Sequence, residues 1–289
     1  MIRAAIALCL LLAVTTPARA QALLACGWDE VFILEVADTP RKIWRWKAAD
    51  QPELPAEYRT RFRTTDECKP VAGNRILITA SSDGAALVDR ATGQTLWWGA
   101  CGNAHSAELL PGDRVVLACS LREGTGNKLA LFDLREPGRE IAATELYSGH
   151  GVVWDAARNR LWALGEKELR AYRLDAWESA QPALTLDARY PLPDVDGHEL
   201  SEVPGSSQLI VSTHAGVWRF DRETQTFTPD PDLQGVPDVK SASLHAATGR
   251  LAYTQAEPPN WWTSRIRFRR PDLVLELEGE KLYKVRWVQ

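Results

Sequence analysis

Three of the five histidines in the chain occupy the same place in a repeated segment. His105, His150 and His198 each begin a short strand-like run that is followed by a turn, an Arg or Gln, and an apolar run. Asp66 and Lys240 hold the same place in two further copies. If equivalent residues of successive repeats face a common axis, these side chains meet at one site. His105, His150, His198 and Lys240 are therefore the candidate catalytic residues.

A cluster of imidazoles is compatible with three kinds of chemistry. Three neutral imidazoles near a carboxylate suit one divalent metal ion, which makes His105, His150 and His198 tentative metal ligands. Without a metal, a histidine can act as general acid or base near neutral pH, while lysines hold an acidic group. The third interpretation is structural, with histidines that fix the turns between repeats by hydrogen bonds. The sequence leaves all three open.

Other polar and aromatic residues are placed to contact a ligand near the same mouth. The charged ones lie at or just after the start of a repeat, and two adjacent tryptophans follow the proline-containing loop 257–260, which cannot pair regularly. Exposed aromatic rings in such a loop can stack on sugar rings, and packing between repeats is the alternative. The predicted ligand-binding residues are Asp66, Glu67, Lys69, Glu108, Lys284, Trp261 and Trp262.

The spacing of the repeats predicts the element that positions these residues. The recurring Arg or Gln falls at positions 75, 114, 160, 208 and 250, which are 39, 46, 48 and 42 residues apart. Hairpin turns at 82–84 and 91–93 separate short apolar strands within one repeat. A period of this length with several short strands is typical of a β-propeller blade.

The two ends of the chain predict how the ring closes. Residues 281–289 alternate like the first strand of a blade, but no blade follows them. The segment 26–36, which we predict as one strand, begins a repeat that has no first strand of its own. We therefore predict an all-β, six-bladed β-propeller in which the C-terminal strand completes the first blade. Seven blades is the alternative, if residues 48–65 hide further strands.

The N-terminus predicts export. Arg3, an apolar run at 4–14 and the small-x-small sequence at 18–20 are typical of a signal peptide over residues 1–20. Residues 21–289 then form a single propeller domain in the periplasm or outside the cell. The apolar run is too short for a permanent transmembrane segment, and no other stretch qualifies. A lipid anchor at Cys26 is the alternative, because residues 23–26 loosely resemble a lipobox.

Four cysteines remain after removal of the signal, namely Cys26, Cys68, Cys101 and Cys119. They allow three disulfide pairings, and the spacing does not choose among them. A buried free thiol is an equal alternative for each. Because no Cys-x-x-Cys occurs, a thiol-ligated zinc site is not predicted.

The composition narrows the choice of partner. The formal net charge is −4, so the chain lacks the excess of basic residues that would indicate binding to nucleic acid. The sequence contains no Gly-x-Ser-x-Gly elbow, no phosphate-binding glycine loop and no dinucleotide fingerprint. The twelve tryptophans are interpreted mainly as packing between blades.

Several short motifs together resemble one known family. They are the segments that start at Cys26, Asp66, Ala104, Ser148 and Trp261. The sequence resembles an exported bacterial family catalogued as domain of unknown function 6528, over nearly all of the mature chain. The resemblance implies a propeller-like fold and export, and it implies no activity.

These observations favour an exported propeller that binds a small molecule or a carbohydrate in the cell envelope through its polar, histidine-lined channel mouth. The alternative is a metal- or histidine-dependent lyase or hydrolase that acts on acidic glycans, an analogy drawn from fold alone. Whether the protein is an enzyme, and which ligand or metal it takes, stays open at this level.

Overall fold

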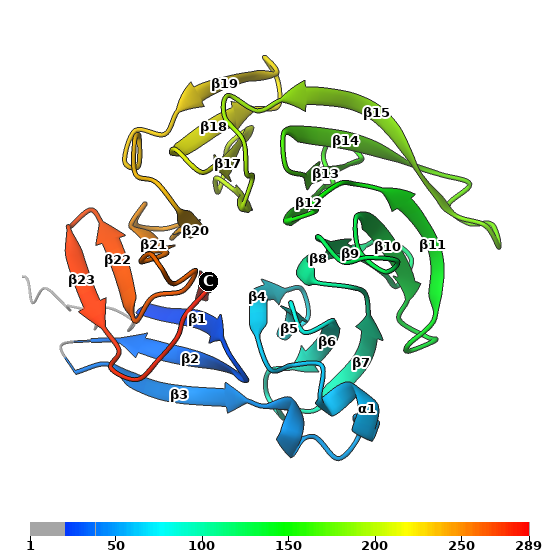
Figure 1. The fold of residues 1–289 in the computed structure, drawn as a ribbon, viewed down its shortest axis with the longest axis horizontal. Helices are drawn as coiled ribbons and strands as arrows, with labels where there is room; N and C mark the ends of the chain where they lie inside the picture. Colours follow the sequence, from blue (N-terminus) through cyan, green and yellow to red (C-terminus); the bar gives the residue numbers. More distant parts are fainter. Residues whose placement is uncertain (1–20, 38, 289) are drawn as a thin grey trace, which may run out of the picture.

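The computed structural model describes residues 21–37 and 39–288. Six four-stranded antiparallel sheets are arranged around a central axis (Figure 1). The prediction of an all-β, six-bladed propeller is confirmed.

In each blade the four strands follow one another from the axis outward. The first blade contains β24 (Lys284–Val288), β1 (Gln21–Gly27), β2 (Glu30–Val36) and β3 (Arg41–Trp46). The second contains β4 (Thr65–Val71), β5 (Arg75–Ala80), β6 (Gly84–Asp89) and β7 (Thr95–Ala100). The third contains β8 (Ala104–Leu110), β9 (Arg114–Cys119), β10 (Lys128–Asp133) and β11 (Glu140–Glu145).

The other three blades repeat this order. The fourth contains β12 (Gly151–Asp155), β13 (Arg160–Leu164), β14 (Glu168–Asp175) and β15 (Ala183–Pro191). The fifth contains β16 (Glu199–Glu202), β17 (Gln208–Ser212), β18 (Val217–Asp221) and β19 (Thr226–Pro229). The sixth contains β20 (Val239–Leu244), β21 (Leu251–Gln255), β22 (Arg265–Arg269) and β23 (Leu273–Glu276).

The C-terminal strand closes the ring as predicted. β24 pairs antiparallel with β1, with Cys26 opposite Lys284, and forms the innermost strand of the first blade. Residues 48–65 contain the 3-10 helix η1 (Ala48–Asp50) and the one-turn helix α1 (Ala56–Arg59), and their only strand residue is Thr65, the first residue of β4. The seven-blade alternative is therefore wrong.

The predicted strand over residues 26–36 is instead the end of one strand and the whole of the next. β1 and β2 form a hairpin that reverses at Trp28, whose φ is 49°. Leu23 to Cys26 and Val31 to Leu34 are all buried, so no alternation of apolar and polar residues marks either strand. Because the two apolar runs read as one, the reversal was missed.

The core lies between the blades, where large aromatic side chains fill the wedge. Trp97 of the second blade meets Phe132 of the third, with ring centroids 5.5 Å apart. Trp46 packs on Phe62 in the same way, at 5.2 Å. All four side chains are at most 1% exposed, so replacing any of them by alanine would cost about 3–5 kcal/mol of folding free energy.

The cysteines divide into one bridge and two thiols. Cys101 and Cys119 form a disulfide beside the start of β8. Cys26 and Cys68 are fully buried free thiols, and the sulfur of each lies near the carbonyl oxygen of Lys284. The pairing depends on which strands become neighbours, so the spacing did not reveal it.

The predicted signal peptide, residues 1–20, lies outside the described residues, and β1 begins at Gln21. Cys26, the alternative anchor residue, is buried within β1. Among the described residues, no helix has the length and apolar character needed to cross a bilayer.

Candidate functional site

Three inner strands begin with an irregularity that turns one residue out of the ladder. The register shifts between Thr65 and Glu67 in β4, and equivalent shifts occur at the starts of β8 and β20. The skipped residues are Asp66, His105 and Lys240. A bulge of this kind re-aims a side chain, here toward the channel mouth.

In the other three blades, the equivalent residue stands just before the inner strand. The backbone N–H groups of His150 and His198 bond to carbonyl oxygens at the ends of β13 and β17. Tyr283 precedes β24 and donates its N–H to the carbonyl of Cys26. Each blade thus supplies one residue to a circle that we call the mouth ring: Asp66, His105, His150, His198, Lys240 and Tyr283.

The mouth ring lines a cavity of about 410 Å³. Ser81, Asn103, Arg122 and Trp261 complete its wall. This size is at the lower end of the range for small-molecule sites. Tyr283, Arg122, Ser81 and Asn103 were not predicted from the sequence. The alternation of residues 281–289 did carry a signal for Tyr283, but the next residue, Lys284, was predicted to contact the ligand instead.

The three histidines are neighbours along one side of the ring. The ring centroids of His105 and His150 are 4.3 Å apart, and those of His150 and His198 are 5.0 Å apart. Nδ1 of His105 lies 3.1 Å from the carbonyl of Asn103, and Nδ1 of His150 lies 2.8 Å from that of Ser148. A carbonyl can only accept, so Nδ1–H donates in both rings and Nε2 is left as an acceptor.

His198 has the opposite tautomer. Its Nε2 lies 3.1 Å from a carboxylate oxygen of Asp196, so Nε2–H donates. Its Nδ1 is buried and has no hydrogen-bond partner in the described part of the chain. A buried acceptor without a donor costs about 1–3 kcal/mol, which a ligand that supplies a donor would recover.

Burial keeps the imidazoles uncharged. It lowers the pKa of His105 to about 3, with a further effect from the charge of Lys284. Burial also lowers the pKa of His150 well below its ordinary value. For His198 burial outweighs the hydrogen bond to Asp196, and its pKa is lowered as well. The rings therefore present lone pairs at neutral pH.

Asp66 and Lys240 are the ionisable groups on either side of the histidines. Burial raises the pKa of Asp66 to about 7, although the carboxylate accepts a hydrogen bond from the backbone N–H of Ser81. Burial lowers the pKa of Lys240, and nearby acidic groups partly offset this effect. The ring thus combines a lysine with a carboxyl group whose pKa is raised to near neutrality.

Below the mouth ring, four buried charges form the floor of the site. Arg286 donates to both carboxylate oxygens of Glu199 at 2.7 and 3.0 Å, and to Glu67 at 2.8 Å. Lys284 lies 3.5 Å from Glu67 and 3.3 Å from Glu199. Burial alone would raise the pKa of Glu67, but the charges of Arg286, Lys284 and Lys69 lower it to about 2. We call these four residues the floor cluster.

Glu67 and Lys284 were predicted to bind ligand, but both belong to the floor cluster and neither lines the cavity. Each follows a mouth-ring residue by one position along its strand, and the alternation of the strand turns it away from the mouth. Lys69 and Glu108 lie farther along the channel and pair at 3.0 Å, with Lys69 also donating to the carbonyl of Val152. These residues do not line the cavity either.

The two adjacent tryptophans have different roles. Trp261 lines the cavity, is 42% exposed, and stacks on Trp28 with centroids 5.2 Å apart and planes at 15°. Trp262 does not line the cavity; its ring meets Trp28 edge-on at 5.6 Å. Trp261 therefore offers aromatic surface to a ligand, whereas Trp262 supports the stack.

The metal hypothesis stays a prediction. Nδ1–H bonds to carbonyls, as at His105 and His150, are common where a histidine binds metal through Nε2. However, in residues 21–37 and 39–288 no group of three His, Cys, Asp or Glu side chains is placed to hold a metal ion.

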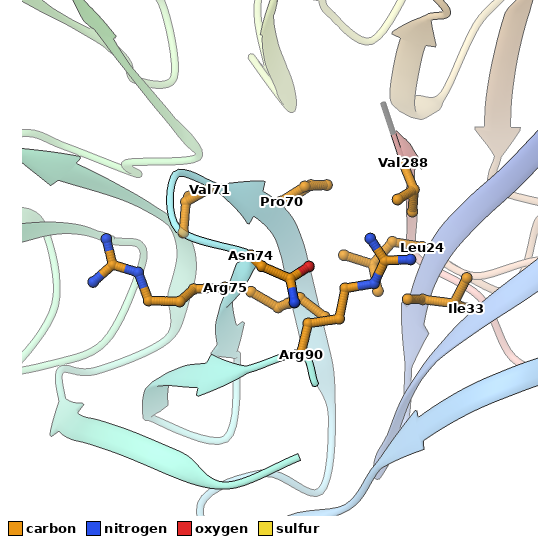
Figure 2. A pocket seen from close by; sticks show the side chains of 9 residues that line it. Leu24, Ile33, Pro70, Val71, Asn74, Arg75, Arg90 and Val288 are labelled. Atoms are coloured by element: carbon orange, nitrogen blue, oxygen red, sulfur yellow. The ribbon is translucent and has the colours of Figure 1, made fainter. Parts of the chain in front are cut away.

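A second cavity of about 290 Å³ lies between the first two blades (Figure 2). Leu24, Ile33 and Val288 line one side, and Figure 2 shows Arg90 reaching toward them while Arg75 points the opposite way. None of the predicted site residues lines it. Because its apolar side belongs to the core between blades, it is not the candidate site.

Comparisons with known proteins agree with the fold. A chain in a crystal structure described as a nidogen/laminin complex superposes with a TM-score of 0.64 at 11% sequence identity, covering 93% of this chain and 98% of that one. At this identity the likeness concerns the fold alone. No curated protein matches the sequence. The model of a family of unknown function, DUF6528, matches residues 6–289, and the chain belongs to that family.

Proposed function

We propose that this propeller binds a small acidic sugar in the cavity of the mouth ring. The observation that carries the proposal is the buried Nδ1 of His198, an acceptor without a donor, in a wall that also holds Lys240. Nε2 of His105 and of His150 add two further acceptors. A ligand that supplies several donors and one negative charge would satisfy this wall.

A sugar with a carboxylate has the required groups. Its hydroxyls can donate to the imidazole nitrogens, and its carboxylate can accept from Lys240 and Arg122. Arg122 is half exposed and pairs with Asp83 at 3.0 Å, so it can also turn toward a ligand.

Titration calorimetry with galacturonate and with galactose tests the proposal. The wild-type protein should bind galacturonate more tightly than galactose, and Lys240→Met should reduce this preference. Lys167→Met is the matched control, because Lys167 is exposed and lies outside the cavity. If neither sugar binds, or if the two lysine variants behave alike, the proposal is wrong.

The enzyme hypothesis remains the second candidate because of one observation. Asp66, with its pKa near 7, shares the cavity with the uncharged imidazoles, so the site has both a proton donor and proton acceptors at neutral pH. Incubation with oligogalacturonates tests for both activities. A lyase would produce unsaturated ends that absorb light, and a hydrolase would produce new reducing ends without that absorbance. Asp66→Asn should remove any activity found. If neither signal appears with or without added divalent metal, binding alone remains.

We also propose that the protein is exported, on the basis of residues 1–20. Cell fractionation of the full chain and of a chain without these residues provides the test. The full chain should be found in the periplasm or the medium, and the shortened chain should stay in the cytoplasm. The same cellular location for both would contradict export by this segment.

A further inference from the structure

The loops around the mouth ring carry exposed apolar side chains. Tyr147 is 53% exposed and precedes His150 by three residues, and Val195 is 45% exposed and precedes His198 by three. Leu121 is 49% exposed, and its carbonyl oxygen accepts a hydrogen bond from the side chain of Asn103 in the cavity wall. We call these three residues and Trp261, which also lines the cavity, the apolar rim. The proposed binding of a single sugar does not account for this rim.

The two aromatic members of the rim lie on opposite sides of the channel. Tyr147 is on the connection from β11 to β12, between the third and fourth blades. Trp261 is on the loop from β21 to β22 of the sixth blade. Figure 1 shows these two connections across the axis from each other. A ligand that touches both rings must therefore pass over the mouth ring.

We infer that the ligand is an acidic oligosaccharide that crosses the mouth, with one sugar in the cavity and its neighbours against Trp261 and Tyr147. This inference rests on the proposed function and extends it from a single sugar to a chain. Aromatic side chains at the two ends suit sugar rings, because both faces of a pyranose can present C–H groups to an aromatic ring. The polar centre supplies the contacts that select the acidic sugar.

The Trp261 platform is held in place before any ligand binds. Glu257, in the same loop, accepts from the Thr263 hydroxyl at 2.9 Å and from Arg265 at 3.1 Å. Trp28 covers one face of the Trp261 ring. A ring fixed in this way loses little conformational freedom on binding, which favours affinity.

The connection that carries Tyr147 is also anchored. The carbonyl oxygen of Tyr147 accepts from the N–H of Glu166 at 3.3 Å, and the N–H of Ser148 donates to the side chain of Asn127 at 3.0 Å. The Tyr147 ring nevertheless stays half exposed. The backbone is therefore fixed while the ring remains available to a ligand.

Calorimetry with galacturonate, its trimer and its pentamer tests the inference. The oligomers should bind the wild type about tenfold or more tightly than the monomer, since each stacked aromatic contact adds roughly three- to tenfold. Tyr147→Ala and Trp261→Ala should each reduce this gain with chain length. Tyr147→Ala should leave monomer binding unchanged. Leu96→Ala is the control, because Leu96 is equally exposed but lies on β7, away from the mouth.

The outcomes separate the two proposals. Monomer binding without a gain for the oligomers overturns the inference and leaves the proposed function standing. A gain that neither aromatic variant reduces also overturns the inference. If neither monomer nor oligomer binds, both proposals are wrong.

Discussion

Arg286 and Glu199 form a buried bidentate ion pair across the central channel, with nitrogen–oxygen distances of 2.7 and 3.0 Å. Arg286 lies on the C-terminal strand β24 of the first blade, and Glu199 begins the inner strand of the fifth. The same guanidinium also bonds to Glu67 of the second blade. One side chain near the end of the chain thus connects three blades beneath the proposed ligand site.

Removing this guanidinium should strongly destabilise the fold. In Arg286→Met, Glu67 and Glu199 would stay buried with Lys284 as the remaining cation of the floor cluster. Breaking a buried pair from one side typically costs about 3–5 kcal/mol. Urea unfolding followed by circular dichroism measures the free energy of unfolding.

Arg135→Met is the matched control for this variant. Arg135 pairs with Asp133 at 2.6 Å, but its own side chain is 69% exposed. Loss of an exposed pair should cost less than about 1 kcal/mol. Equal losses in the two variants would contradict a special role for the floor cluster.

Asp66→Asn should make the protein more stable at alkaline pH. The folded-state pKa of about 7 lies above the ordinary value of 3.8, so the folded state binds the extra proton between these values. Stability of the wild type should therefore fall as pH rises from about 4 to 7, by at most about 4 kcal/mol. The asparagine variant should lack this fall, because the amide does not ionise.

Thermal unfolding of both proteins between pH 4 and pH 8 checks this expectation. Asp89→Asn serves as the control, because hydrogen bonds from Thr92 lower the pKa of the Asp89 carboxyl below its ordinary value of 3.8. Any stability that this ionisation contributes is essentially complete at pH 4, so the pH curve of this variant should run parallel to that of the wild type. Parallel pH curves for wild type and Asp66→Asn would show that Asp66 is not held in its neutral form.

The mouth-ring histidines should stay uncharged at mildly acidic pH. Their lowered pKa means that the unfolded chain binds more protons below its ordinary histidine pKa of 6.5, so acid should favour unfolding. Proton–nitrogen correlation spectra of the imidazoles at pH 5.5 should show neutral rings. His105 and His150 should be Nδ1–H tautomers, and His198 should be the Nε2–H tautomer. A charged His105 at this pH would be incompatible with its burial.

The two free thiols should not react with a thiol reagent until the protein unfolds. Cys26 and Cys68 are fully buried, and burial raises the pKa of Cys68 well above its ordinary value. A chain that begins at Gln21 should give no reaction with a thiol reagent when native. It should give two thiols per molecule in denaturant, with Cys101 and Cys119 joined. None or four thiols in denaturant would refute this pairing.

The blade count and the ring of three histidines could be predicted because both follow from repeat phase. His105, His150 and His198 hold equivalent places in their repeats, and rotational symmetry brings equivalent residues together. Closure of the ring by the C-terminal strand could be predicted because residues 281–289 alternate like a first strand and no blade follows them. Repeat spacing and strand alternation can be recognised in the sequence without knowing which distant segments come into contact.

The rest of the site depends on contacts between distant segments. Arg122 and Asn103 reach the cavity from loops whose direction no repeat fixes. Glu67 and Lys284 were predicted as ligand contacts, but each forms an ion pair with a residue of another blade within the floor cluster. Lys284 was predicted as a ligand contact, but the preceding residue Tyr283 stands in the mouth ring, because adjacent residues along a strand point to opposite faces.

Mapping of galacturonate binding by amide and imidazole chemical shifts shows whether the ligand binds at the mouth ring. We predict saturable shifts at the imidazoles of His105, His150 and His198 and at the amides of Lys240 and Trp261. Residues around the second cavity, such as Arg90, should not shift. Shifts centred on Arg90, or no saturable shifts at the mouth ring, would contradict the claim that this ring is a binding site for acidic sugars.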